Sequence, residues 1–359
     1  MEGPFGVAVF GCGGVSAGHL SAYAAHPDID LVATVDVRAE LAESAARRWG
    51  AHRAYSSVEQ ALADPAIQVA DLCLPHDLHA PIGLQAMEAG KHVFVEKPIA
   101  NTLAEADAMI AASRKHDVIL MVDQTKRYQN RHRKIKELLE AEYVGEPILV
   151  RSSYPQDITH AWTHMEPRRR ETYWKRDGVV SGIGIHALDL LRWLIGEVVE
   201  VQAMVSTSDL IEPGRQTEDS GIVMLRFANG CIGEVMVSYV LKDPGMASSW
   251  DLMPLEIYGR DGSLTMDKDD RIRVFSERLA QKAARGVLEV ETRPPVGAPR
   301  LPAEGMAGAI AHVVECLSTG ARPLTDGAEA RASLEVVEAA YRSVRERRAI
   351  ALPLEPAMV

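Results

Sequence analysis

The sequence has few aromatic residues, few cysteines and no long apolar run, and each shortage excludes a class of protein. Aromatic residues make up 5% of the 359 residues, whereas hydrophobic residues make up 47%. The core must therefore be built from aliphatic side chains, as in parallel sheets covered by helices. The four cysteines are widely separated and include no CxxC pair, so we expect reduced thiols and neither a disulfide framework nor a metal site.

The chain also lacks an excess of basic residues. Its formal net charge is −11, which argues against nucleic acid or an acidic membrane surface as a partner and favours a small molecule. No apolar run approaches the roughly 18 residues of a membrane span, and the first residues lack a basic region followed by an apolar stretch. We therefore expect a cytoplasmic protein with no membrane partner.

Short apolar runs alternate with Ala-rich amphipathic stretches from residue 5 to about residue 123, a pattern typical of repeated βαβ units. The apolar runs are Val7–Phe10, Leu31–Val35, Val69–Leu74, His92–Val95 and Val118–Val122. The helical stretches are Leu41–Trp49, Ile82–Ala89 and Leu103–His116, the last with Asn101 or Thr102 as a possible N-cap. Because crossovers are right-handed, residues 1–123 are predicted to form an N-terminal, doubly wound Rossmann domain of the α/β class.

The remaining residues, 124–359, show a different pattern. A helical stretch at Arg131–Glu142 is followed by longer β-rich runs: Ile148–Tyr154, Val198–Ser206, Ser220–Phe227, Cys231–Val240 and Leu255–Tyr258. Asn229-Gly230 predicts a hairpin with a type I′ turn, and helices are expected at Leu188–Leu194 and Glu329–Arg347. We expect a C-terminal α+β domain with a large, mainly antiparallel sheet that binds substrate and forms the oligomer.

A glycine-rich motif after the first apolar run predicts a dinucleotide site. Gly11, Gly13 and Gly14, with Val15, stand between a strand and a helix, where backbone N–H groups and the helix dipole can bind a pyrophosphate. Ser16 replaces the third glycine of the fingerprint. Asp36 directly follows the second apolar run, about 20 residues after the glycine motif. The dinucleotide-binding fingerprint has a carboxylate at this offset, which binds the ribose hydroxyls. This favours NAD over NADP, although Arg38 lies close in sequence to Asp36.

Several further motifs resemble the Gfo/Idh/MocA family of sugar and inositol dehydrogenases. They are residues 71–75 (DLCLP), His79, residues 89–98 (AGKHVFVEKP), residues 184–189 (GIHALD), and residues 257–259 with 262–264. The resemblance extends over nearly the whole chain. It implies a two-domain NAD-dependent dehydrogenase that acts on a CH–OH group of a sugar-like substrate. It also implies cofactor contacts at Pro75, His79, Glu96 and Lys97, and a homodimer or homotetramer.

The resemblance implies that Lys97 and His186 are the catalytic residues. Lys97 would lie at the end of a parallel strand and could polarise the reacting oxygen, with Glu96 in support. His186 has a side chain suited to exchanging the hydroxyl proton, and Asp189 could orient its ring from one helical turn away. Arg127 occupies the place of a family arginine as a structural or crevice residue.

The sequence departs from the family pattern at Gly182, where relatives commonly have an Asp four residues before the histidine. The candidates to replace this polar group are Asp177, Asp189, Asp157 and His160, and the sequence does not choose among them. His160 and His164 also have the spacing of two metal ligands, but we interpret them as loop or pocket residues because no HExxH motif accompanies them.

Two other functions are compatible with the same residues. One is a glycoside-cleaving enzyme in which NAD is recycled through oxidation, elimination and re-reduction. The other is a non-enzymatic NAD-binding regulator, a hypothesis that the glycine at position 182 supports and that the presence of Lys97 and His186 opposes.

Overall fold

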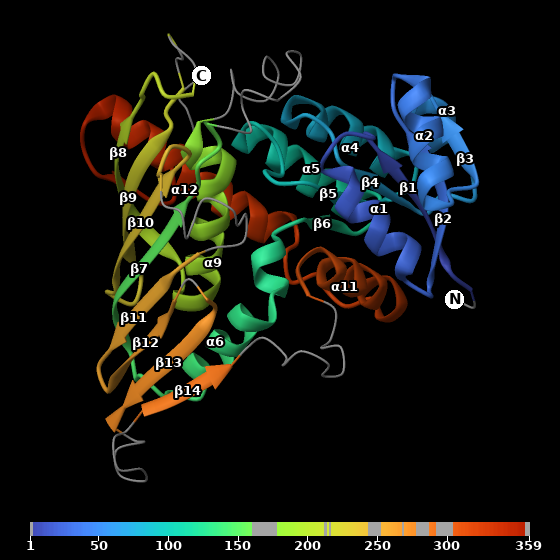
Figure 1. Cartoon of the computed structure of the whole chain (residues 1–359). Helices are drawn as coiled ribbons and strands as arrows, with labels where there is room; N and C mark the ends of the chain where they lie inside the picture. Colours follow the sequence, from blue (N-terminus) through green and yellow to red (C-terminus); the bar gives the residue numbers. More distant parts are fainter. Residues whose placement is uncertain are drawn as a thin grey trace. The chain divides into compact units, whose positions relative to one another are not determined.

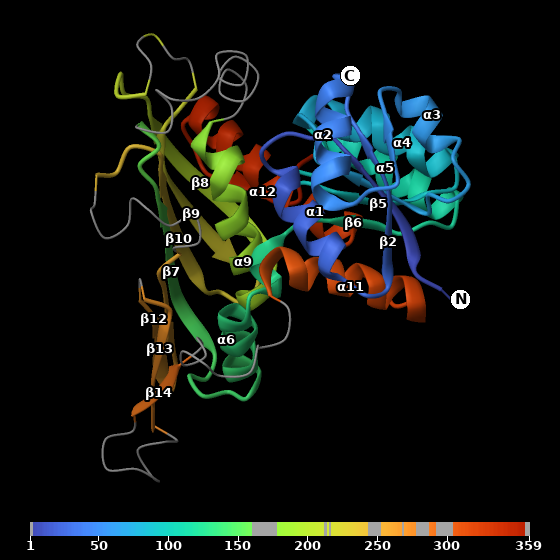
Figure 2. The ribbon, with the colours of Figure 1, turned by 45° about the vertical axis from the view of Figure 1, so that its right-hand side comes forward.

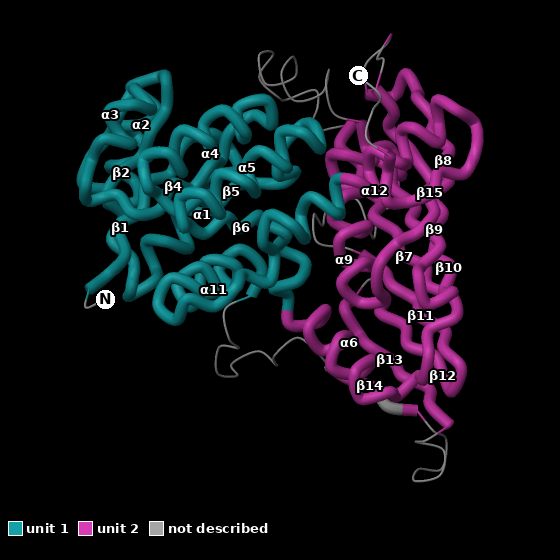
Figure 3. Tube along the Cα trace, turned by 180° about the vertical axis from the view of Figure 1, so that it is seen from behind, with its two compact units in different colours: residues 1–129, 302–334 teal, residues 130–301, 335–359 magenta. Residues whose placement is uncertain are grey.

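The structure is a computed structural model that describes residues 3–159, 178–211, 214, 217–242, 253–267, 269–277, 287–291 and 304–355. The chain forms two compact units (Figure 3). Unit 1 comprises residues 1–129 and 302–334, and unit 2 comprises residues 130–301 and 335–359. None of the described helices is long and apolar enough to cross a membrane.

Unit 1 contains a six-stranded parallel sheet with the order β3-β2-β1-β4-β5-β6. Its strands are β1 (Phe5–Phe10), β2 (Ile29–Val35), β3 (Arg53–Tyr55), β4 (Val69–Leu72), β5 (His92–Val95) and β6 (Leu120–Val122). The predicted doubly wound sheet is confirmed, with the strand order reversing between β1 and β4. Only the short strand β3, which is largely exposed, was not expected.

Helices cover both faces of this sheet (Figure 1). They are α1 (Ser16–Ala25), α2 (Ala39–Trp49), α3 (Val58–Leu62), α4 (His79–Glu88), α5 (Leu103–Lys115) and α11 (Gly305–Thr319), with 3₁₀ turns η1 (His76–Leu78) and η2 (Thr125–Tyr128). Alternate residues of β1 point to opposite faces, so that Val7 and Val9 pack in a cluster with α1 and α11. Ala8 and Phe10 pack in the cluster that includes side chains of α4 and α5. The late segment 302–334 thus completes one layer of unit 1.

The start of α5 shows why the predicted N-cap forms. Thr102 accepts a hydrogen bond from the Glu105 N–H at 3.2 Å, and the Glu105 carboxylate accepts one from the Thr102 N–H at 3.0 Å. This reciprocal pair is a capping box. Of the two candidates, Thr102 is therefore the N-cap.

Unit 2 contains a nine-stranded sheet with the order β14-β13-β12-β11-β7-β10-β9-β8-β15. Its strands are β7 (Pro147–Pro155), β8 (Val198–Ser206), β9 (Ser220–Phe227), β10 (Ile232–Ser238), β11 (Leu255–Gly259), β12 (Gly262–Met266), β13 (Arg271–Ser276), β14 (Val287–Glu291) and β15 (Ile350–Ala351). All neighbouring pairs are antiparallel except β7 and β10. The predicted mainly antiparallel sheet is confirmed.

The described helices of unit 2 lie on one face of this sheet (Figure 2). They are α6 (Asn130–Glu140), the π-helical turn η3 (Val180–Gly184), α9 (Ile185–Ile195) and the second half of α12 (Gly327–Glu346). Strand β9 alternates strictly, with buried Val223 and Leu225 on the helix-covered face and exposed Ile222 and Met224 on the other. The second face is covered by no described helix.

The hairpin between β9 and β10 forms as predicted, but the type I′ turn is wrong. Gly230 has a φ of 87°, whereas Asn229 does not have a positive φ. The Gly230 N–H donates to the Phe227 carbonyl at 2.9 Å, and the Phe227 N–H donates to the Cys231 carbonyl at 2.9 Å. The loop therefore has three residues, Ala228 to Gly230, and only its last position requires glycine.

Candidate functional site

The glycine loop of unit 1 is built as a phosphate-binding turn. Gly11 has a φ of 91°, and a Cβ there would lie 2.3 Å from the Cys73 carbonyl oxygen, so that only glycine fits. A Cβ at Gly13 would meet nothing within 4 Å, which leaves its backbone open to a ligand. Ser16 donates a 2.7 Å hydrogen bond to the Gly13 carbonyl. It closes the loop onto α1, whose N-terminal side presents the exposed Gly14 and Val15.

Asp36 follows β2 at the same edge of the sheet. Its carboxylate accepts hydrogen bonds from the Cys12 N–H and the Arg38 N–H, each at 2.9 Å. The Arg38 guanidinium, about half exposed, lies 3.5 Å from the same carboxylate. The acidic group is therefore held against the glycine loop, and Arg38 is paired with it.

His79 is a buried residue that joins two loops at this edge. Its ring nitrogens lie 2.8 Å from the Pro98 carbonyl and 2.9 Å from the Leu74 carbonyl. The loop after β4, which includes Pro75, is thereby tied to the loop after β5. Within the described structure, His79 orients the backbone beside the expected cofactor site.

Lys97 is the second residue after β5, and it is mostly buried at 9% exposure. Its N–H donates to the Glu96 carboxylate at 3.1 Å. The other oxygen of Glu96 lies 3.1 Å from Nε2 of His19 on α1. The predicted pair Glu96 and Lys97 is therefore anchored by a histidine that our sequence analysis did not identify.

His19 is fully buried among three carboxyl groups. Its Nδ1 lies 2.8 Å from Asp71 on β4, and its Nε2 lies 3.7 Å from Asp123, which follows β6. Burial alone would lower the pKa of His19, but Asp71 and Cys73 together, through their charges and hydrogen bonds, outweigh burial and raise that pKa well above the usual range. Burial and the neighbouring Glu96 raise the pKa of Asp123, whereas His19 and then Lys97 lower that of Glu96 despite its burial. Within this network, the surroundings of His19 and Glu96 favour the charged forms of these two groups, whereas the surroundings of Asp123 favour its protonated form.

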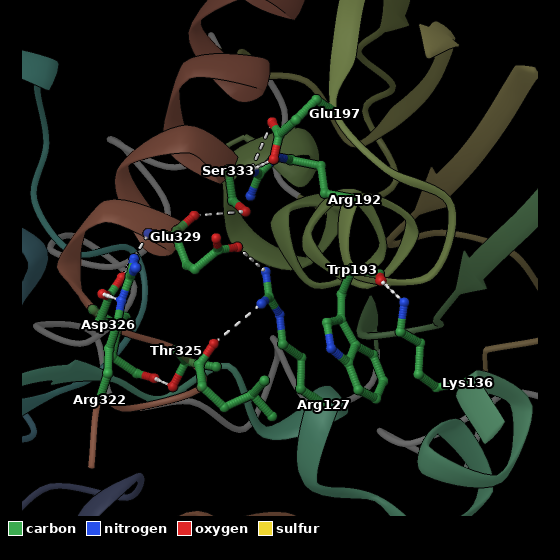
Figure 4. Close-up of polar contacts among 12 residues, drawn as sticks. Arg127, Lys136, Arg192, Trp193, Glu197, Arg322, Thr325, Asp326, Glu329 and Ser333 are labelled. Atoms are coloured by element: carbon green, nitrogen blue, oxygen red, sulfur yellow. Dashed lines mark hydrogen bonds and ion pairs between the residues drawn. The ribbon is translucent and has the colours of Figure 1, made fainter. Parts of the chain in front are cut away.

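Arg127 lies in η2 and is almost completely buried. It donates to the Leu324 carbonyl at 3.2 Å and to the Glu329 carboxylate at 3.1 Å (Figure 4). Both partners belong to unit 1. The structure therefore gives Arg127 a structural contact with the segment that completes unit 1.

His186 lies in the first turn of α9, next to the inner face of the sheet of unit 2. Its ring centroid is 6.2 Å from that of Tyr154 on β7. Asp189, one turn later, is almost fully buried. Both predicted residues are thus on one helix of unit 2.

The space beside Gly182 in η3 is already occupied. A Cβ at this position would lie 2.2 Å from the hydroxyl oxygen of Tyr239. The structure thus places a phenol where a side chain at position 182, such as the aspartate that the family resemblance implies, would begin. A tyrosine far along the sequence was not among our candidates, because only the sheet brings it to this helix.

One other candidate, Asp157, binds its own loop in the described structure. The Asp157 carboxylate accepts a 3.0 Å hydrogen bond from the Thr159 N–H and binds the Thr159 hydroxyl. It therefore stabilises its own loop. His160, His164 and Asp177 lie outside the described residues.

Together, the strand order of unit 1, the glycine turn, the helix N-terminus and the carboxylate after β2 define a dinucleotide-binding oxidoreductase fold. The chain belongs to the Gfo/Idh/MocA family: residues 5–124 match the oxidoreductase family with an NAD-binding Rossmann fold, and residues 132–265 match the GFO/IDH/MocA C-terminal domain. It is an NAD-dependent oxidoreductase.

The chain is similar to several characterised relatives along most of its length. It is 28% identical to the D-apiose dehydrogenase of Paraburkholderia graminis, covering 96% of this chain and 89% of that one. It is 29% identical to the levoglucosan dehydrogenase of Pseudarthrobacter phenanthrenivorans, covering 80% of each. A solved structure of levoglucosan dehydrogenase with NADH and levoglucosan has a TM-score of 0.84 at 26% identity, covering 98% of this chain and 100% of that one.

Proposed function

We propose that the protein reversibly oxidises a secondary hydroxyl of a neutral sugar or polyol with NAD. The observation that carries this proposal is the position of Lys97. It follows a central parallel strand at the edge that holds the glycine loop and Asp36, and its main chain is fixed by Glu96. The names of the relatives, which are dehydrogenases of apiose, levoglucosan and inositol, support a sugar-like substrate.

The residues of unit 1 fit an NAD molecule. Gly11, Gly13, Gly14 and Val15 would hold the pyrophosphate, and the Asp36 carboxylate would accept hydrogen bonds from the adenosine ribose. The loops that contain Pro75 and Glu96 would border the nicotinamide end. When bound, NAD supplies the hydride acceptor of the oxidation.

We assign the proton chemistry to Lys97 and His186. The Lys97 ammonium stabilises negative charge on the substrate oxygen, and the His186 imidazole accepts or returns the hydroxyl proton. Glu96 fixes Lys97 through the main chain. Asp189 orients His186 from the same helix.

A substrate screen tests the reaction class. We expect one or more compounds among neutral polyols, aldoses and glycosides to give NADH, detected by its absorbance. Turnover of a glycoside without net NADH would instead favour the NAD-recycling mechanism. NAD binding with no turnover across the panel would favour a regulator.

Lys97→Ala tests the assignment of the lysine. We expect turnover to fall by roughly 10²–10⁴, the range for a positioned acid–base group, while NAD binds nearly as before. Lys115→Ala, on the exposed side of α5, is the control and should behave like the wild type. Normal turnover of Lys97→Ala would remove this residue from the mechanism, and a collapse of NAD affinity would make it a cofactor-binding residue.

We infer that the protein acts in the cytoplasm as a homodimer or homotetramer. All four cysteines are free, which supports a reducing compartment. Exposed apolar side chains on the open face of the nine-stranded sheet support self-association. The negative net charge supports a small-molecule partner and opposes binding to nucleic acid.

A further inference from the structure

The π-helical turn η3 begins the helical segment that carries His186. It runs directly into α9, in which His186 is the second residue. The first N–H groups of a helical segment have no partner within the helix and must be bound by other groups. Val179, at the N-cap position, has no polar side chain that could accept these N–H groups. Whatever binds them therefore fixes the start of the segment.

Two side chains from distant parts of unit 2 bind these N–H groups. The Val180 N–H donates to Oε1 of Glu218 at 3.2 Å, and the Ser181 N–H donates to the Tyr341 hydroxyl at 3.1 Å. The Tyr341 hydroxyl in turn donates to the same Oε1 at 2.8 Å. A carboxylate is favourable here because the N-terminal end of a helix carries a partial positive charge. Glu218 and Tyr341, which we call the clamp, thus replace a local N-cap.

The backbone before the turn is shaped to admit the carboxylate. A Cβ at Gly178 would lie 1.8 Å from Oε1 of Glu218, so that any larger residue would displace the clamp. The Gly178 carbonyl accepts hydrogen bonds from the Gly182 N–H at 2.9 Å and from the Ser181 hydroxyl at 3.2 Å. Glu218 is 8% exposed, and its own carbonyl accepts from the Val179 N–H at 3.1 Å. The carboxylate is therefore enclosed by the backbone that it binds.

Both members of the clamp are anchored to the nine-stranded sheet, which α9 and the second half of α12 cover on one face (Figure 2). Glu218 lies two residues before β9, and the intervening Asp219 N–H donates to the carbonyl that ends β8 at 3.0 Å. Tyr341 lies on α12, where the Ser343 hydroxyl accepts from the Ala203 N–H of β8 at 3.0 Å. Burial and the charge of Glu218 raise the pKa of Tyr341 well above its usual range, so the hydroxyl keeps the hydrogen that it donates.

We propose that Glu218 and Tyr341 are positioning residues that hold the start of α9 so that the His186 imidazole meets the substrate hydroxyl. This inference rests on the proposed function, in which His186 accepts the hydroxyl proton. Proton transfer requires the acceptor within hydrogen-bond reach, and a misplacement of about 1 Å can cost roughly 10²-fold in rate. Loss of the clamp should therefore slow the chemical step and spare NAD binding, which we assign to unit 1.

Substitution of either member tests the clamp. In Tyr341→Phe we expect kcat to fall roughly 10- to 100-fold, while KM for the polyol and Kd for NADH change less than about threefold. Glu218→Leu should lower kcat in the same way, whereas Glu218→Gln, which keeps an acceptor oxygen, should stay close to the wild type. Ser343→Ala is the matched control, because it removes another hydroxyl of α12 that binds β8 instead of η3. It should lower the melting temperature and leave kcat unchanged.

A second measurement does not depend on turnover. The NMR signals of the His186 ring, assigned with His186→Asn, report the surroundings of this ring. They should shift or broaden in Tyr341→Phe and Glu218→Leu, whereas Ser343→Ala should leave them unchanged. If they respond in this way while the wild type oxidises no polyol, the positioning of His186 holds and only the proposed function fails. Unchanged His186 signals in Tyr341→Phe, an unchanged kcat in an active enzyme, or an equal loss of kcat in Ser343→Ala would overturn the clamp.

Discussion

His19 is a fully buried residue in the core of unit 1, and its raised pKa depends on groups contributed by several elements. Asp71 comes from β4, Cys73 from the loop after it, Glu96 follows β5, and Asp123 follows β6, while Tyr23 lies on its own helix. These residues are far apart in sequence. In the sequence alone, His19 is one more polar residue on an amphipathic helix, whereas Asp36 could be predicted because the glycine motif specifies its offset.

We expect the stability that His19 contributes to depend on pH with a definite sign. Its pKa in the folded protein is raised above 6.5, so its contribution is fully present below pH 6.5 and is lost as the pH rises through the folded pKa. His19→Gln should therefore destabilise the protein by about 3 kcal/mol at low pH, as when one partner of a buried pair is removed. Melting temperatures measured from about pH 6 to about pH 10 should show the difference from the wild type narrowing.

His92→Gln is the matched control for this measurement. His92 lies on β5 in the same unit, accepts a 3.0 Å hydrogen bond from the Ile119 N–H, and has a pKa that burial lowers. It is neutral throughout the alkaline range. Its difference from the wild type should stay constant there, and an equally constant difference for His19→Gln would show that His19 is not charged in the folded protein.

The occupied space at Gly182 leads to a steric prediction. Gly182→Ala should destabilise the protein by about 1–3 kcal/mol, because its Cβ would overlap the Tyr239 hydroxyl. In Gly182→Ala/Tyr239→Phe the nearest atom becomes Cζ at 3.4 Å, so much of the stability should return in urea unfolding. Gly184→Ala, whose Cβ would meet atoms no closer than 3.4 Å, should be tolerated. Additive effects of the two substitutions would contradict the overlap.

At the scale of elements, the sequence predicted the position of a helix or strand correctly where the pattern lies within the residues of that element. The ranges of β8 and β9 were predicted to the residue because each is a run rich in apolar and β-branched residues. The turn after β9 was predicted in place but not in type, since Asn229-Gly230 is compatible with loops of two or three residues and the register of β9 and β10 decides between them. Helix α11 was missed, because its apolar residues resemble core material and no distinct motif marks its start.

The capping box of α5 allows an element-level test. Thr102→Ala removes the side-chain acceptor for the Glu105 N–H and should cost about 1 kcal/mol of unfolding free energy. Asn101→Ala is the control, because Asn101 contributes only its backbone N–H to the same carboxylate. Chemical denaturation with circular dichroism would measure both. Equal losses in the two variants would show that the cap does not stabilise α5.

At the scale of the whole molecule, chain order alone does not reveal how the units are composed. Residues 302–334 return to unit 1, where Arg127 and Tyr128 contact them, and α12 begins in unit 1 and ends in unit 2. From the sequence alone, we assigned residues 302–334 to the C-terminal domain, because they follow its predicted strands along the chain. The contacts that return it to unit 1 join residues about 200 positions apart, and no local pattern encodes them.

The open face of the nine-stranded sheet is the surface that we expect to form the oligomer. Its exposed apolar residues are Met204, Ile222, Met224, Ile232, Tyr258, Phe275 and Val287, and ion pairs such as Arg151 with Glu234 lie among them. Large apolar patches with polar surroundings are typical of interfaces between subunits. No described helix covers this face (Figure 2).

Met204 and Ile222 are directly opposite each other on β8 and β9, so a pair of charges there would lie within the patch. Met204→Glu/Ile222→Glu should shift the mass measured by light scattering from that of a dimer or tetramer to that of one chain, because a buried glutamate without a partner is costly at an interface. The unit 2 fold should persist, since both side chains are exposed within the single chain. Val37→Glu, at an apolar residue of unit 1 that is 86% exposed, is the matched control and should leave the mass unchanged. A wild type that is monomeric, or a double variant that stays assembled, would show that this face is not the interface, and a loss of mass in Val37→Glu as well would point to a general effect of added charge.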